Sequence, residues 1–215
     1  MTSTFFWRRA LLFFGTAFAV AACSTGPQIT RTQDLSESAD APYQNILIIA
    51  LFPEFDTRRR LEKAVVEELT ELGTEAVAST SLMDSNTPMT RQTFLKMIES
   101  LDVDAALITH PLDIESKTAV KDSSPEATYK FGPTYYFNVW EVGLTEYVEP
   151  QNVVVEGSYV LATQFFSVLN REAVWAIESK SDVVEHSCAG CDYMIFVDEA
   201  EAIVKHLSND GLIAQ

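Results

Sequence analysis

The chain has 215 residues, with 15 basic and 31 acidic side chains and a formal net charge of −16 at pH 7. Such an acidic chain repels phosphate backbones and anionic lipid headgroups, which argues against a nucleic-acid partner. The length is sufficient for one domain with its own hydrophobic core, preceded by shorter segments.

Residues 1–22 are typical of a secretory signal peptide. Two arginines, Arg8 and Arg9, precede an apolar run over residues 10–22, which is shorter than the roughly 20 residues that span a bilayer. The run ends in VAACS, a stretch that resembles the lipobox of bacterial lipoproteins and puts Cys23 at the lipidated position. We therefore expect diacylglycerol and palmitate on Cys23. An ordinary signal peptide with an incidental cysteine is the alternative.

Ser24 follows Cys23, where an aspartate would resemble an inner-membrane retention signal. We therefore expect a lipid anchor in the outer membrane with the protein on its periplasmic face. Removal of the leader would leave 13 basic and 31 acidic side chains, a net charge of −18. Attachment to the membrane would then depend on the acyl chains, because they need no basic patch.

Residues 23–42 contain almost no large apolar side chains, and we predict a lipidated flexible tether there. Residues 43–215 are predicted to form a single periplasmic domain. Its first half alternates apolar β-branched runs with amphipathic stretches, which predicts a βαβαβ unit with parallel strands. The predicted strands cover residues 45–52, 74–80 and 103–114, and the predicted helices cover residues 57–72 and 91–101.

The first of these helices is predicted to bury one apolar stripe and to end near Gly73. Its polar face is expected to carry two i,i+4 ion pairs, Arg58–Glu62 and Lys63–Glu67.

The second half of the domain is predicted to be an antiparallel three-strand meander over residues 134–148, 152–169 and 172–181. A helix over residues 198–208 closes the chain. Gly211 suits the left-handed position after it, and Leu212 can pack back on Leu207. The predicted fold class is α+β, with a mixed sheet covered by helices.

Cys188 and Cys191 remain as a pair once Cys23 carries lipid. In the oxidising periplasm we expect them to form a disulfide. The spacing CAGC before a helix also suits a redox dithiol. A zinc site is disfavoured because Cys188, Cys191 and His186 supply at most three of about four ligands, and no metal is predicted.

The chain lacks the G-x-S-x-G, Walker A and G-x-G-x-x-G motifs, so we expect neither an enzyme nor a cofactor. A candidate interaction surface combines a basic cluster at a helix N-terminus with an aromatic-rich strand. Its residues are Arg58, Arg59, Arg60, Tyr135, Tyr136 and Phe137.

The order of lipobox, NILIIALF, VDAALIT, NREAVWAIESKS, final helix and GLI resembles a group of small bacterial outer-membrane lipoproteins of unknown function. Their periplasmic domains are similar to those of CsgG, LpoB and the N-terminal part of TolB. The resemblance implies a buried tryptophan at Trp175 and a role in binding or assembly rather than catalysis.

These observations predict a non-enzymatic accessory factor of the cell envelope that binds an envelope protein or the cell wall. A thiol-disulfide oxidoreductase using Cys188 and Cys191 is the first alternative. A homo-oligomeric subunit of a CsgG-like secretion assembly is the second.

Overall fold

The structure is a computed structural model that describes residues 26–35, 40–116, 138–140, 157–182 and 191–214, with the backbone alone at 113–116, 157–159, 182 and 191–194. These residues form a mixed six-stranded sheet in the order β1-β6-β5-β4-β2-β3, which confirms the predicted α+β class. The elements are β1 (Gln28–Asp34), β2 (Asn45–Ala50), α1 (Phe55–Glu71), β3 (Glu75–Ala78), η1 (Ser79–Ser81), α2 (Arg91–Ser100), β4 (Ala105–Ser116), β5 (Gly157–Ser167), β6 (Glu172–Asp182) and α3 (Cys191–Asn209).

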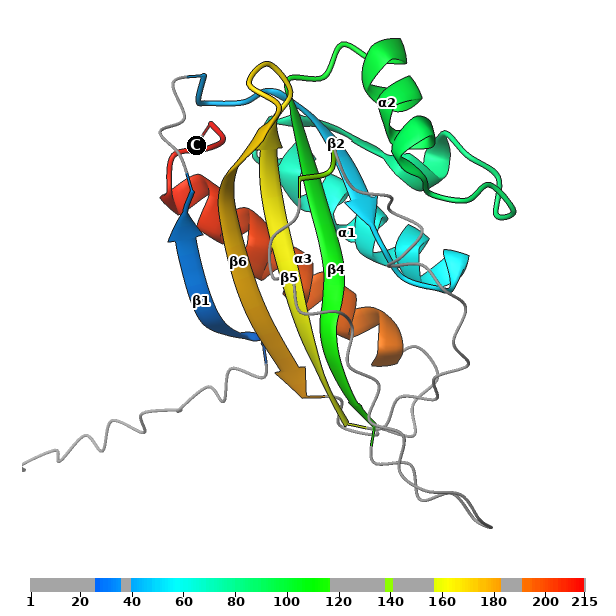
Figure 1. Ribbon diagram of the computed structural model, residues 1–215. Coiled ribbons are helices and arrows are strands. Elements are labelled where there is room, and N and C mark those ends of the chain that lie inside the picture. Colours follow the sequence, from blue (N-terminus) through cyan, green and yellow to red (C-terminus); the bar gives the residue numbers. More distant parts are fainter. Residues whose placement is uncertain (1–25, 36–39, 117–137, 141–156, 183–190, 215) are drawn as a thin grey trace, which may run out of the picture.

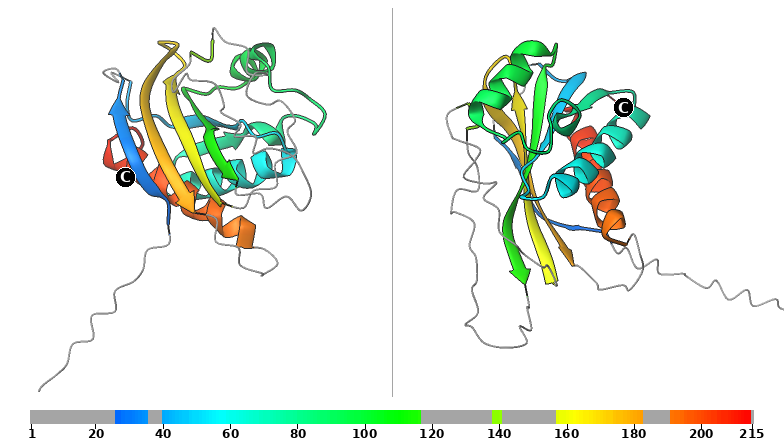
Figure 2. Two further views of the ribbon diagram at one scale, coloured as in Figure 1. Left: turned by 60° about the horizontal axis from the view of Figure 1, so that its bottom comes forward. Right: turned by 90° about the vertical axis from the view of Figure 1, so that its right-hand side faces the viewer.

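Helices cover both faces of the sheet. Figures 1 and 2 show α1 and α3 on one face and α2 on the other, beside β2 and β4. Strand β2 is buried on both faces, because Ile46 and Ile48 pack with α1 and α3 while Leu47 and Ile49 pack with α2. This burial explains why its sequence is a continuous apolar run rather than an alternating one.

The βαβαβ unit is confirmed, since β2 pairs in parallel with both β3 and β4. Helix α1 ends as predicted, because Gly73 follows it with a φ of 84°. Helix α2 begins at a side-chain cap, in which the Thr90 hydroxyl accepts the Thr93 N–H at 3.1 Å.

Strands β4, β5 and β6 pair antiparallel in succession. The strand expected over residues 134–148 lies mainly outside the described residues, and its described part, residues 138–140, ends in a turn. Trp140 of that turn is buried edge-to-face against Phe94 and Phe166, with ring centroids 5.4 and 5.7 Å apart.

Helix α3 begins seven residues earlier than its apolar pattern predicts, at Cys191. Its C-terminal turn agrees with the prediction: Gly211 has a φ of 73°, and Leu212 is buried in the same cluster as Leu207. Trp175 of β6 is also fully buried, as expected.

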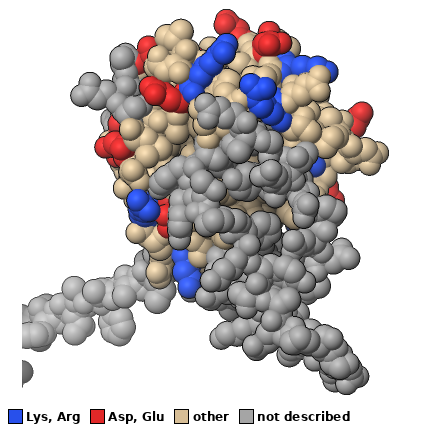
Figure 3. Space-filling model, in the orientation of Figure 1, with Lys and Arg blue, Asp and Glu red and all other residues tan. Residues whose placement is uncertain are grey.

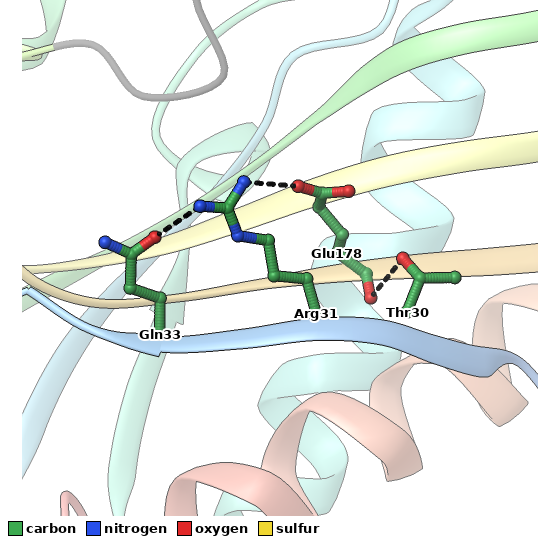
Figure 4. A network of polar contacts seen from close by, with 4 residues as sticks. All are labelled: Thr30, Arg31, Gln33 and Glu178. Atoms are coloured by element: carbon green, nitrogen blue, oxygen red, sulfur yellow. Dashed lines mark hydrogen bonds and ion pairs between the residues drawn. The ribbon is translucent and has the colours of Figure 1, made fainter.

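The expectation of a flexible tether is corrected for residues 28–34, which form β1 along the edge of β6. Figure 4 shows the polar contacts that secure this strand: Arg31 Nη1 lies 3.6 Å from Glu178 Oε1, and Thr30 donates to the Glu178 carbonyl at 3.4 Å. Arg31 also donates to Gln33 at 3.1 Å. The apolar periodicity of the sequence does not reveal this strand, because backbone pairing with β6 and polar side-chain contacts hold the strand in place.

Candidate functional site

A cleft of about 850 Å³ lies where the chain leaves the carboxyl ends of β2 and β3. One wall consists of residues 54–57 with Arg59 and Arg60, at the start of α1. The other consists of Thr80, Met83, Asp84 and Ser85, in η1 and the loop after it.

The topology explains why a cleft forms here. Strand β2 continues into α1 on one face of the sheet, whereas β3 continues through η1 into α2 on the other face (Figure 2). Two neighbouring parallel strands whose connections leave to opposite faces create a crevice outside their carboxyl ends. Ligands bind at such switch points in open α/β sheets, so we take this cleft as the candidate site.

A buried carboxylate, that of Glu62, links the two walls of the cleft. Glu62 of α1 is fully buried, and its two oxygens accept four hydrogen bonds. The donors are the Ala50 N–H at 2.9 Å and three groups at 2.7 Å, namely the Ser79 hydroxyl, the Thr80 N–H and the Thr80 hydroxyl. Glu62 therefore ties α1 to the ends of β2 and β3.

The pKa of Glu62 is raised by burial, an effect that its hydrogen bonds oppose. A carboxylate has about four acceptor positions, and here four donors from the scaffold occupy them. Glu62 is therefore positioned to stabilise the cleft rather than to exchange protons with a ligand.

The predicted Arg58–Glu62 ion pair on the polar face is wrong, because both side chains lie on the buried face of α1. The companion pair Lys63–Glu67 does form, at 3.4 Å. Arg58 and Glu62 occupy the same angular sector as Leu61 and Val65, so a charged pair within an apolar stripe was the signal that could have identified them.

The basic cluster divides between interior and surface. Arg58 is 3% exposed, whereas Arg59 and Arg60 are exposed on the cleft wall. Arg59 pairs with Asp56 at 2.9 Å. The guanidinium carbon of Arg58 lies 5.1 Å from the ring centroid of Phe55. Burial lowers the pKa of Arg58, and the nearby charge of Glu62 opposes this shift.

The other predicted site residues lie outside the described side chains. Cys23, Cys188, Tyr135, Tyr136 and Phe137 are not among the described residues, and only the backbone of Cys191 is described, as the first residue of α3. The disulfide, the lipid and the aromatic part of the interaction surface therefore stay predictions.

A second buried carboxylate, which sequence reasoning also missed, joins α3 to β6. Glu199 is 1% exposed and accepts hydrogen bonds from the hydroxyls of Ser179 and Ser181. Burial raises the pKa of Glu199 to about 7, and the two hydroxyls oppose this rise.

On the face shown in Figure 3, the basic and acidic side chains of the described residues are interspersed. Among these residues, no group of three or more His, Cys, Asp or Glu side chains is arranged to hold a metal ion. No helix within the described ranges is long and apolar enough to cross a membrane.

Comparison with known protein families finds no match, and no curated protein matches at the significance required. Among solved structures, the chain is similar to the PelC dodecamer from Paraburkholderia phytofirmans, with 13% identity, a TM-score of 0.46 and coverage of 88% of this chain and 99% of that one. It is also similar to lipoprotein GNA1162 from Neisseria meningitidis, with 12% identity, a TM-score of 0.38 and coverage of 77% and 99%.

These likenesses are too distant to transfer a function or an oligomeric state to this chain. They also leave the resemblance to CsgG, LpoB and TolB a prediction.

Proposed function

We propose that this chain is a lipid-anchored lipoprotein of the bacterial outer membrane whose periplasmic domain binds another envelope component. The leader and the VAACS stretch support the anchor at Cys23. The cleft at the carboxyl ends of β2 and β3 is the single observation that supports a binding role. Its walls are held in place by Glu62, so the surface offered to a partner is preorganised.

We propose further that this role is binding rather than catalysis. The buried carboxylate nearest the cleft is Glu62 among the described residues, and its acceptor positions serve the scaffold. Arg59, one of the two exposed arginines on the cleft wall, is already paired with Asp56. This arrangement favours recognition of a partner surface.

Site-specific cross-linking in native envelopes tests the binding role. A photo-reactive residue replaces Asp84 on the cleft wall or, as the control, exposed Lys205 on α3. We expect a cross-link to a different envelope component from position 84 and none from position 205. Recovery of only copies of this chain would support a homo-oligomer instead, and equal labelling from both positions would contradict a role for the cleft.

The anchor is tested separately. Cys23→Ser should abolish incorporation of labelled palmitate and move the protein from the membrane fraction to the periplasmic fraction. Cys191→Ser serves as the control, because it removes a different cysteine of the same chain. Retention of Cys23→Ser in the membrane fraction would contradict the proposed anchor.

One observation favours a thiol-disulfide oxidoreductase as the second candidate. Helix α3 begins at Cys191, and the positive end of a helix dipole lowers the pKa of a thiol. The redox potential of the Cys188–Cys191 pair distinguishes the two functions. A potential far below that of the periplasm, without insulin reduction, supports a structural disulfide. A potential near −120 mV, about that of a strong periplasmic oxidant, supports the enzyme.

A further inference from the structure

Arg58 is a buried cation, and two of its three guanidinium nitrogens have no hydrogen-bond partner within the described structure. Its side chain is 3% exposed, and neither Nε nor Nη1 has a hydrogen-bond partner. An arginine keeps its charge in proteins, and burial of an unpaired charge is strongly unfavourable. The contact with the Phe55 ring offsets only part of this cost.

Glu62 does not supply the missing acceptor. Its oxygens accept from Ala50, Ser79 and Thr80, and no ion pair joins it to Arg58. The negative charge of Glu62 favours the charged guanidinium from a distance, but it leaves Nε and Nη1 of Arg58 without an acceptor.

The guanidinium lies at the N-terminal end of α1. Helical side chains lean toward the N-terminus, and the Arg58 side chain reaches Phe55, three residues earlier. The first backbone N–H groups of a helix have no partner within the helix. The N-cap residue, Glu54, makes no side-chain hydrogen bond to them. Two kinds of unused hydrogen-bond donor therefore lie at the first turn of α1, namely N–H groups of the Arg58 guanidinium and backbone N–H groups.

This turn also forms part of the cleft. Phe55 is half-buried and lines the cleft, while the Arg58 guanidinium stacks against its ring. Arg58 itself is not part of the cleft lining, so contact between its guanidinium and a group in the cleft requires the Phe55 ring to move.

We propose that the N-terminal turn of α1 binds an oxyanion, a carboxylate or phosphate group of the envelope partner, through Arg58 and the first backbone N–H groups of the helix. Guanidinium groups and helix N-termini both bind such oxygens through charge-assisted hydrogen bonds. This inference rests on the binding role proposed for the cleft and names the chemistry recognised there.

Titration of the purified full chain with inorganic phosphate and, separately, with acetate tests the inference at constant ionic strength. NMR follows the Arg58 Nε–H and the backbone amides of residues 55–57, and thermal unfolding is measured in parallel. The titration extends to high millimolar concentrations, because Glu54, Asp56 and Asp84 on the cleft walls disfavour anions.

We expect saturable shifts and a higher Tm with at least one anion, and the anion that saturates identifies the chemistry. Absence of saturation with both anions would overturn the proposal. Lys63→Met, which removes a cation from the exposed face of the same helix outside the cleft lining, should bind as the wild type does. Arg58→Lys should bind at least tenfold more weakly, because one ammonium group cannot reproduce the planar array of donors.

Arg58→Met keeps the apolar stem and removes the unpaired charge, so it should fold with a higher Tm than the wild type when no anion is added. Titration of Arg58→Met with phosphate or acetate should give no saturable NMR shift. A lower Tm, or saturation like that of the wild type, would overturn the proposal. Failure of anion binding with the Asp84 cross-link intact would overturn this inference alone, whereas loss of that cross-link counts against the binding role.

Discussion

Arg58 and Glu62 lie one helical turn apart on the buried face of α1, and their charged groups form no ion pair. Glu62 instead accepts hydrogen bonds from the ends of β2 and η1, while Arg58 leans toward the start of the helix. The two residues therefore have different functions: Glu62 stabilises the cleft, and Arg58 places unused donors beside it.

Glu62→Gln should destabilise the fold by about 2–4 kcal/mol. The substitution replaces one acceptor oxygen with an amide that faces donor groups, leaving buried groups unsatisfied. Urea unfolding of the purified chain measures the loss. Glu67→Gln, on the exposed face of the same helix, is the matched control and should change the unfolding free energy by less than about 0.5 kcal/mol. Equal effects of the two substitutions would contradict the structural role of Glu62.

Asp210→Ala should cost about 1–3 kcal/mol, because it leaves the indole N–H of fully buried Trp175 without its acceptor. In the wild type that N–H donates to Asp210 Oδ2 at 2.7 Å and joins β6 to the turn after α3. Thermal and urea unfolding both report the change. The neighbouring exposed residue provides the comparison: Asn209→Ala should stay within about 0.5 kcal/mol of the wild type. If Asn209→Ala lowered the stability and Asp210→Ala did not, the hydrogen bond between Trp175 and Asp210 would not have the proposed stabilising role.

The βαβαβ core could be predicted because its signals are local. An apolar run identifies β2, apolar periodicity identifies α1 and α2, and the glycines after α1 and α3 end those helices. Strand β1 could not be found in this way, since its position depends on pairing with β6, which follows more than 130 residues later.

The cleft and the buried charges depend on contacts between segments distant in the sequence. The apolar stripe of α1 could have indicated that Glu62 is buried, but not which groups it meets, because its partners Ser79 and Thr80 reach it only through the fold. Glu199 presents the same difficulty, since its partners lie on β6. Periodicity predicts which positions point inward, but it does not predict which polar groups meet there.

His110 should make the protein less stable as the pH falls from about 6.5 to about 4. Burial lowers its pKa to about 4, so the folded chain keeps the imidazole neutral while the unfolded chain binds a proton from about pH 6.5 downward. The difference between the pKa values of His110 in the folded and unfolded chains corresponds to about 3 kcal/mol of unfolding free energy. His110→Gln should remove this contribution, so its unfolding free energy relative to that of the wild type, measured from a series of urea unfolding curves, should rise by about 3 kcal/mol as the pH falls from 6.5 to 4. His206→Gln, in the last turn of α3, should keep this contribution. A difference between His110→Gln and the wild type that does not change with pH would assign the effect to other groups.

Glu199 should have the opposite effect on the pH dependence of stability, making the protein less stable as the pH rises. Its pKa rises from 4.5 to about 7 on folding, so the stabilisation is complete below about pH 4.5 and is lost as the pH rises through 7. The difference between the pKa values of Glu199 in the folded and unfolded chains again corresponds to about 3 kcal/mol of unfolding free energy. Glu199→Gln keeps an acceptor for Ser179 and cannot ionise, so its stability should match the wild type near pH 4.5 and exceed it at pH 8.

The matched control is Glu201→Gln, on the exposed side of the same helix, which should leave the dependence unchanged. Because the His110 and Glu199 slopes oppose each other between about pH 4.5 and 6.5, the contributions of these two groups to the wild-type profile should largely cancel there. In Glu199→Gln, stability should therefore rise with pH through that range. A Glu199→Gln profile that stays flat, or that falls toward pH 8 as steeply as the wild type, would contradict a protonated Glu199 between α3 and β6.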